Sequence, residues 1–222
     1  MKNYFSPYHL IFFVFLLSIL LMLIQLELLS FAFTKLGLSP TFGLTVLFLS
    51  LLGSAINLPV ARLKSNLPMQ KFTQPVYWGL LRIPVQRFHR ETLVSINLGG
   101  CLIPTMLSIY LFSNSTLSLF STLLGIATIS LISYLFSRPI QGLGIGMPIL
   151  VAPLSAALVG LLISPEQSAP LAYISGTLGV LIGADLLHLK DISKLGAPYA
   201  SIGGAGTFDG IFITGIVAAL LA

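Results

Sequence analysis

The chain has 222 residues, of which 56% are hydrophobic and only 8% are charged, and its mean hydropathy is +1.00. Soluble domains carry about 25% charged residues, so this composition excludes a soluble globular fold. The net charge of +5 would suit a nucleic-acid binder, but the basic residues cluster beside apolar segments, which favours membrane topology and no nucleic-acid partner. The single cysteine, Cys101, excludes an internal disulfide and a cysteine-cluster metal site.

Apolar segments long enough to cross a bilayer recur along the whole chain, since a transmembrane helix needs about 20 mainly apolar residues. The first, within "MKNYFSPYHLIFFVFLLSILLMLIQLELLS", lacks a small-residue cleavage site and is interpreted as an uncleaved span. The predicted spans are residues 9–31, 41–61, 92–112, 116–137, 143–163, 168–189 and 202–222. The sequence therefore predicts an all-α polytopic bundle of about seven spans, forming one transmembrane domain over residues 1–222.

Lysine and arginine are distributed asymmetrically between the two ends of these spans. With the N-terminus in the cytoplasm, Lys35 is the one basic residue of eleven that faces outward. The others face inward: Lys2, Arg62, Lys64, Lys71, Arg82, Arg87, Arg90, Arg138, Lys190 and Lys194. Positive residues mark the cytoplasmic side, so we expect an internal N-terminus and an external C-terminus in the inner or cytoplasmic membrane of the cell. The basic loop at about 62–91 is interpreted as a topology anchor or, alternatively, as a docking or gating surface.

Three of the middle spans contain notable small or polar residues. Span 3 includes "SINLGGCLIP", in which Asn97 is a candidate supporting residue. Span 5 includes "QGLGIGMPILVAP" and is either a broken helix, of the kind at which transporters bind substrates, or a kinked and packed one. Small residues allow close helix packing in membranes, and span 6 carries such a stripe at Gly176, Gly179 and Gly183.

Two acids in the last two spans, Asp185 and Asp209, are the candidate catalytic residues. Asp185 lies about one turn before the inner end of span 6, and His188 follows at i+3, on the same helical face. A short connector joins spans 6 and 7, so the two helices are expected to be neighbours, with both acids at a similar depth. Two close carboxylates can share a proton, activate water, bind a cation or relay a proton. Alternatively, each acid only pins the bundle through a hydrogen bond.

Glycines precede Asp209 in the segment "SIGGAGTFDGIFITG". They either allow close packing or leave the start of span 7 unwound, which is tolerated beside a water-filled cavity. The glycine density and Pro198 favour an irregular backbone from Gly203 to Thr207. The candidate supporting or substrate-binding residues are therefore His188, Gly203, Gly204, Gly206 and Asn97.

The quoted motifs in spans 3 and 5, with "AYISGTLGVLIGADLLHL" and "SIGGAGTFDGIFITG", resemble domain-of-unknown-function family 1614, whose members are prokaryotic membrane proteins. The resemblance covers roughly residues 90–222, and the last two motifs are its most specific part. This family implies no established activity.

The layout of the two acids is also similar to that of intramembrane aspartyl proteases of the GxGD type, in which neighbouring helices each supply one catalytic aspartate. The resemblance implies that Asp185 and Asp209 act as general base and general acid. The second motif here reads "GAGTFD", and alanine rather than tyrosine precedes Asp185.

Two functional classes follow from these features. The first is an aspartyl-type hydrolase that acts on a transmembrane peptide within the lipid bilayer. The second is a carrier or channel for a proton or small cation, and a non-enzymatic membrane scaffold is a further alternative. No metal site is expected, because His9, His89 and His188 fall in different regions, and no phosphate loop or dinucleotide fingerprint indicates a cofactor.

Overall fold

The computed structural model of the chain describes residues 7–64, 91–140, 144–192, 199–204 and 210–222, and most of these are helical. The first half contains α1 (Pro7–Lys35), α2 (Pro40–Gly53), β1 (Asn57–Lys64), β2 (Glu91–Asn97), η1 (Leu98–Leu102) and α3 (Ile103–Asn114). The middle contains α4 (Leu119–Phe136), β3 (Arg138–Ile140), β4 (Gly144–Gly146), α5 (Val151–Ile163) and η2 (Pro165–Gln167). The last part contains α6 (Ser168–Val180), η3 (Leu181–Leu186), α7 (Leu189–Ile192), β5 (Tyr199–Ile202) and α8 (Gly210–Leu221).

Apolar helices occur within each of the seven predicted spans, in the predicted order. By length and composition, three of the described helices can cross a membrane: Tyr8–Lys35, Leu119–Phe136 and Pro165–Leu186. The shorter apolar helices are Pro40–Gly53, Leu98–Asn114, Val151–Ile163 and Gly210–Leu221. The helices therefore indicate a membrane protein, while the number of spans and their orientation stay predictions.

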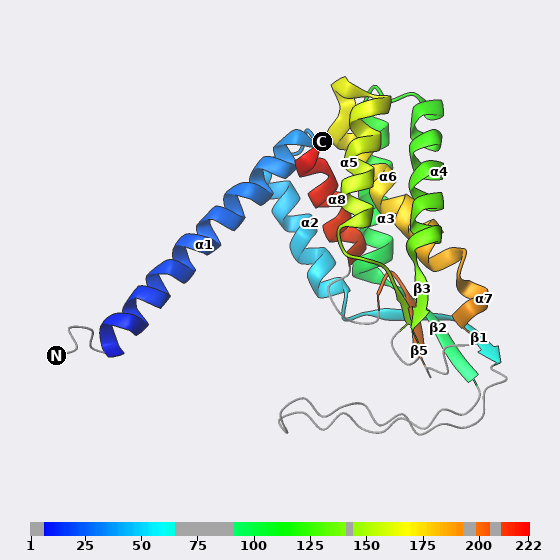
Figure 1. The fold of residues 1–222 in the computed structure, drawn as a ribbon, viewed down its shortest axis with the longest axis horizontal. Helices are drawn as coiled ribbons and strands as arrows, with labels where there is room; N and C mark the ends of the chain where they lie inside the picture. The colour runs from blue at the N-terminus through cyan, green and yellow to red at the C-terminus, as the bar shows by residue number, and fades with distance from the viewer. Residues whose placement is uncertain (1–6, 65–90, 141–143, 193–198, 205–209) are drawn as a thin grey trace.

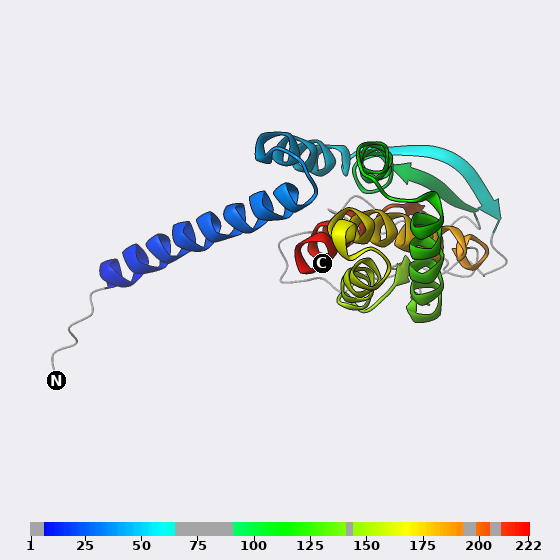
Figure 2. The same cartoon turned by 90° about the horizontal axis from the view of Figure 1, so that it is seen from above.

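The first helix, α1, extends away from the other helices in both views (Figure 1 and Figure 2). Every side chain from Tyr8 to Leu28 is exposed, and the helix contacts the bundle only through its last two turns. There Phe33 is buried against Gly43 of α2. A helix that is apolar on all faces and exposed along most of its length is typical of a membrane span surrounded by lipid.

The centre of the bundle is α6, which packs against α3, α4, α5 and α8. At Gly176, a Cβ atom would meet Ala156 of α5 and Ala218 of α8. At Gly179 and Gly183 it would meet α4, where the backbone of Ser130 lies against Gly183. The structure thus confirms that this stripe permits close packing, and that α8 lies beside α6.

Short strands gather at one end of the bundle (Figure 1). They form a three-stranded sheet in the order β1-β2-β5 and a separate two-stranded sheet of β3 and β4. Strand β2 pairs antiparallel to β1 and parallel to β5. Parallel pairing matches Leu93 with Tyr199 and Ile96 with Ile202.

These strands correct the all-α prediction and the boundaries of four predicted spans. Helix α2 ends at Gly53 rather than residue 61, and the helical part of span 3 begins at Leu98 rather than residue 92. The helix of span 5 begins at Val151, after β4, and that of span 7 at Gly210. Hydropathy alone does not separate a short apolar strand from the end of a helix. The partners of β1, β2 and β5 lie far away in the sequence, so a local window does not detect their pairing, whereas β3 and β4 pair locally.

Candidate functional site

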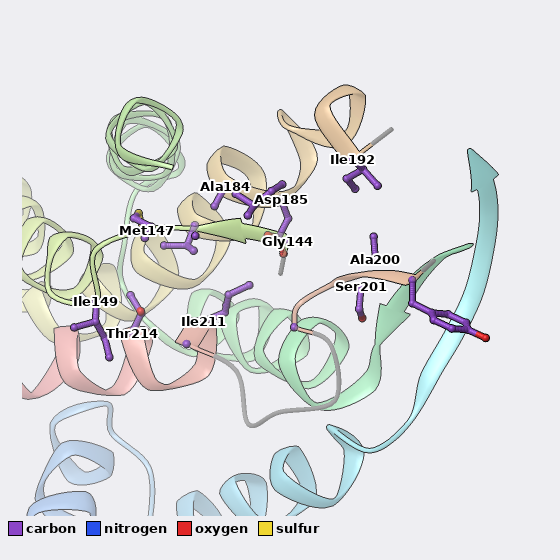
Figure 3. A pocket seen from close by; sticks show the side chains of 16 residues that line it. Gly144, Met147, Ile149, Ala184, Asp185, Ile192, Ala200, Ser201, Ile211 and Thr214 are labelled. Atoms are coloured by element: carbon purple, nitrogen blue, oxygen red, sulfur yellow. The ribbon is translucent and has the colours of Figure 1, made fainter. Parts of the chain in front are cut away.

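A cavity of about 390 Å³ lies where α6–η3 and α8 meet the strands. Its wall includes strand residues of β4 and β5, and Asp185 of η3. Figure 3 shows Asp185 beside Gly144, with Ala200 and Ser201 of β5 on another part of the wall. Ile211 and Thr214 contribute the wall formed by α8. One half-buried carboxylate therefore lies on a cavity at the end of an apolar bundle.

Asp185 is positioned by a backbone hydrogen bond from a distant segment. Its Oδ2 accepts a hydrogen bond of 2.8 Å from the backbone N–H of Gly203. Asp185 lies in η3, a π-helical turn, in which i→i+5 hydrogen bonds accommodate an extra residue. Such turns are frequent at functional sites. The contact joins the end of span 6 to the glycine segment that precedes α8.

The glycine segment is non-helical over the residues that the structure describes. Strand β5 ends at Ile202, and Gly203 and Gly204 have φ values of +83° and +91°. A Cβ atom on Gly203 would lie 2.7 Å from the backbone N of Cys101 in η1. Gly203 is thus enclosed between the two π-helical turns, η1 and η3, where only glycine combines this φ with this close approach.

Residues 205–209, with the predicted site residues Asp209 and Gly206, lie outside the described residues. The described residues on either side of this segment, Gly204 and Gly210, both line the cavity that includes Asp185. The predicted pairing of Asp185 with Asp209 therefore stays a prediction.

His188 has different surroundings from Asp185. It is buried, its ring centre lies 4.8 Å from that of Tyr134, and its Nδ1 lies 3.1 Å from the carbonyl oxygen of Gly183. The cavity lining includes Asp185 and does not include His188. Within the described ranges, these contacts assign His188 to the packing of η3 against α4.

Asn97 is fully buried and organises the strands beside the cavity. Its Nδ2 donates to the carbonyl oxygen of Ser54 at 2.6 Å and to Oδ1 of Asn57 at 3.1 Å. Its Oδ1 accepts from the backbone N–H of Gly100 at 2.7 Å, which caps η1. The contacts of Asn97 are those of a structural residue that holds η1 behind Gly203.

Two polar residues of this network were missed in the sequence. Ser201 donates to Oδ1 of Asn57 at 2.7 Å, so that Asn57 links β5 to Asn97 of β2. Asn57 lies two residues before Pro59 near the end of predicted span 2, and a proline there is a signal that the helix has ended. Among the described residues, no group of three His, Cys, Asp or Glu side chains is arranged to hold a metal ion.

The sequence matches the family described as "Protein of unknown function (DUF1614)" over residues 51–221. The chain belongs to this family. The matched region includes both π-helical turns, all the strands and the cavity, and excludes α1. No curated protein and no solved structure matches the chain.

Proposed function

We propose that this DUF1614 protein is an intramembrane hydrolase of the aspartyl type, which acts on a transmembrane peptide at the cavity of Asp185. One observation carries the proposal: Gly204 and Gly210, which flank the segment of Asp209, line the same cavity as Asp185. Only five residues, 205–209, connect these two glycines, and this short connection supports the proposal that Asp209 serves the same cavity as Asp185.

The proposed chemistry uses one carboxylate as a base and the other as an acid. An ionised carboxylate removes a proton from water, which attacks the carbonyl carbon of the scissile peptide bond, while the protonated carboxyl donates a proton to the departing amine. Two carboxyl groups that lie close together favour this division of roles, because the charge on one opposes ionisation of the other. The hydrogen bond from the backbone N–H of Gly203 to Oδ2 holds the Asp185 carboxyl group in a fixed orientation toward this segment.

The proximity of the acids is tested by crosslinking. In a Cys101→Ala background, which removes the native thiol, Asp185→Cys and Asp209→Cys are combined and the protein is oxidised in membranes. We expect a disulfide, because the proposal requires neighbouring side chains and a disulfide needs Cα atoms within about 7 Å. Asp185→Cys with Glu27→Cys, in the exposed helix α1, is the matched control. Failure of the 185–209 pair to crosslink under conditions in which a reporter disulfide forms would reject the pair.

The activity is tested with the reconstituted full chain and a library of labelled transmembrane peptides, with cleavage products identified by mass spectrometry. Asp185→Asn and Asp209→Asn are each expected to lower cleavage at least 100-fold while the melting temperature stays within a few degrees. A general acid or base contributes about 10²–10⁴-fold to rate. Cleavage that persists in both variants would reject the assignment.

A proton or cation carrier is the second candidate, and three buried serines in and directly after α4 favour it. Among the described residues, the buried hydroxyls of Ser130, Ser133 and Ser137 have no hydrogen-bond partner. Ser130 and Ser133 lie on one face of α4, Ser137 directly follows the helix in extended conformation, and Ser130 lies against η3 at Gly183. Buried polar groups of this kind are often satisfied by water. Proton flux into proteoliposomes that is lowered by Asp185→Asn and by Ser133→Ala, without peptide cleavage, would favour the carrier.

A further inference from the structure

A second cavity, of about 400 Å³, lies at the end of the bundle opposite the strands. It is formed where α1 turns into α2, where α3 ends and where η2 leads into α6. All of its lining segments belong to the described residues, and the cavity shares no residue with that of Asp185. Its lining includes Lys35, Tyr110, Asn114, Glu166 and Gln167.

Lys35 brings a positive charge to this cavity and is held in place by two contacts. Its Nζ donates to the carbonyl oxygen of Leu220 at 3.1 Å and lies 5.8 Å from the ring centre of Phe31. An ammonium group has three N–H donors, so the contact with Leu220 leaves donors for a ligand among the described groups. The carbonyl lies at the C-terminal end of α8, where a positive charge is also favoured by the helix dipole.

Glu166 brings a negative charge to the same cavity. It is exposed and lies in η2, directly before α6. Neutral hydrogen-bonding side chains lie on the wall with it, at Asn114, Ser115 and Gln167. The lining thus combines one cation and one anion with neutral donors and acceptors.

This combination selects for a ligand that carries both charges. A simple anion would meet the carboxylate of Glu166, a simple cation would meet the ammonium of Lys35, and an apolar molecule would give neither charge a partner. A small zwitterion satisfies both at once. The cavity also lies at the end of a bundle with largely apolar outer surfaces, so a bilayer around these helices would place the cavity near the lipid headgroups.

We propose that this cavity binds a zwitterionic phosphoethanolamine group, with its phosphate at Lys35 and its ammonium at Glu166. The group is the headgroup of phosphatidylethanolamine or free phosphoethanolamine. Binding here would join α1, α3 and α6 at one end of the bundle, so occupancy stabilises the protein, and the stabilisation rises with the logarithm of ligand concentration over Kd. This site is independent of any hydrolase or carrier activity.

The test measures the melting temperature of the purified full chain in detergent with added phosphatidylethanolamine, phosphatidylcholine or phosphatidylglycerol of identical acyl chains. Native mass spectrometry of the same samples counts retained lipids. We expect phosphatidylethanolamine to raise the melting temperature most and to be retained at least tenfold better than the other two. The methylated amine of phosphatidylcholine has no N–H for Glu166, and phosphatidylglycerol has no amine. A separate titration uses soluble phosphoethanolamine.

Variants separate this site from general lipid binding. Glu166→Gln is expected to remove the preference for phosphatidylethanolamine over phosphatidylglycerol, and Lys35→Gln to weaken retention of phosphatidylethanolamine at least tenfold. Lys64→Gln, on exposed β1 at the other end, is the matched control and should change neither. Because Glu166 is exposed, its variant is expected to fold even if Lys35→Gln loses stability.

Each result has a defined meaning. Stabilisation by soluble phosphoethanolamine without a lipid preference identifies the free compound as the source, and preference for the lipid alone identifies the headgroup. Equal retention of all three lipids together with no effect of soluble phosphoethanolamine would overturn the site. Retention of the phosphatidylethanolamine preference in Glu166→Gln would overturn it as well.

Discussion

At the scale of single residues, Gly203 shows how one missing side chain permits the site to form. Its amide positions the carboxylate of Asp185, and its Cα lies against η1 in a left-handed conformation. Any other residue brings both a strained φ and a contact with the backbone of Cys101. The hydrogen bond to Asp185 depends on this close approach, so the chemistry of the carboxylate and the packing of η1 are coupled.

The Gly203→Ala variant is therefore expected to lose about 1–3 kcal/mol of stability, the cost of strained backbone together with overpacking. The measurement is the melting temperature of the purified protein. Gly37→Ala is the matched control, because Gly37 has a φ of +74° but no atom within 4 Å of the position of a Cβ. Equal losses for the two variants would show that backbone strain alone accounts for the effect and that the contact with η1 is unimportant.

Asn97→Ala tests the polar network behind the glycine turn. The change leaves the backbone N–H of Gly100 and the carbonyl of Ser54 without this side chain, and a buried polar group that loses its partner costs about 1–3 kcal/mol. We expect a clear drop in melting temperature and faster amide exchange in β2. Asn114→Ala removes an exposed side-chain hydrogen bond, to Tyr110, and should change the melting temperature little. A comparable drop for Asn114→Ala would contradict the importance of burial.

At the scale of elements, the contact between η3 and α4 is a close approach of two backbones beside the site. The backbone of Ser130 occupies the position that a Cβ of Gly183 would take, and His188 lies against Tyr134 in the next turn. Because backbone on α4 adjusts less easily than a flexible side chain, the orientation of η3, and with it of Asp185, depends on this contact.

Gly183→Ala is accordingly expected to destabilise the protein by about 1–3 kcal/mol, a typical cost of overpacking. Thermal unfolding in detergent measures the loss. The control is Gly210→Ala, at the first residue of α8, where a Cβ would meet no atom within 4 Å. If Gly183→Ala is as stable as Gly210→Ala, the approach of η3 to α4 is looser than the structure indicates.

At the scale of the whole molecule, the strands and the basic segments share one end of the bundle. Arg62 and Lys64 lie in β1, Arg138 in β3 and Lys190 in α7, while Lys35 lies at the other end. If positive residues mark the cytoplasmic side, as the sequence predicts, the strand end faces the cytoplasm. The cavity of Asp185 would then face the cytoplasmic side, and the cavity of Lys35 and Glu166 the outer side.

Reporter fusions test this orientation in cells. A reporter fused after Ala222 is expected to report the outer side, and one inserted in the loop at 62–91 should report the cytoplasm, because of the asymmetry in lysine and arginine. Alkaline phosphatase and a fluorescent protein serve as complementary reporters. If both positions report the same side of the membrane, the prediction of seven spans is wrong.

Much of this architecture is determined by the sequence itself. The composition and the lengths of the apolar segments indicate a helical membrane protein. They also predict the order of its longer helices, because the apolar pattern of each such helix is contained in 12 or more neighbouring residues. The small-residue stripe at Gly176, Gly179 and Gly183 predicts where α6 is closely packed, because helical spacing places these residues near one another. The glycines at 203 and 204 likewise predict an irregular backbone ahead of α8.

Only the tertiary structure decided how the segments between the helices are used. Residues 57–64, 91–97 and 199–202 become a sheet because each supplies backbone hydrogen-bond partners to another, and nothing local in any one of them specifies that pairing. The same long-range packing brings the backbone N–H of Gly203 to Asp185. It also gives His188 different surroundings from Asp185, although helical spacing predicts that the two residues share one face. Local pattern acts over a turn or a span, whereas the geometry of the site depends on chain segments brought together from distant parts of the sequence.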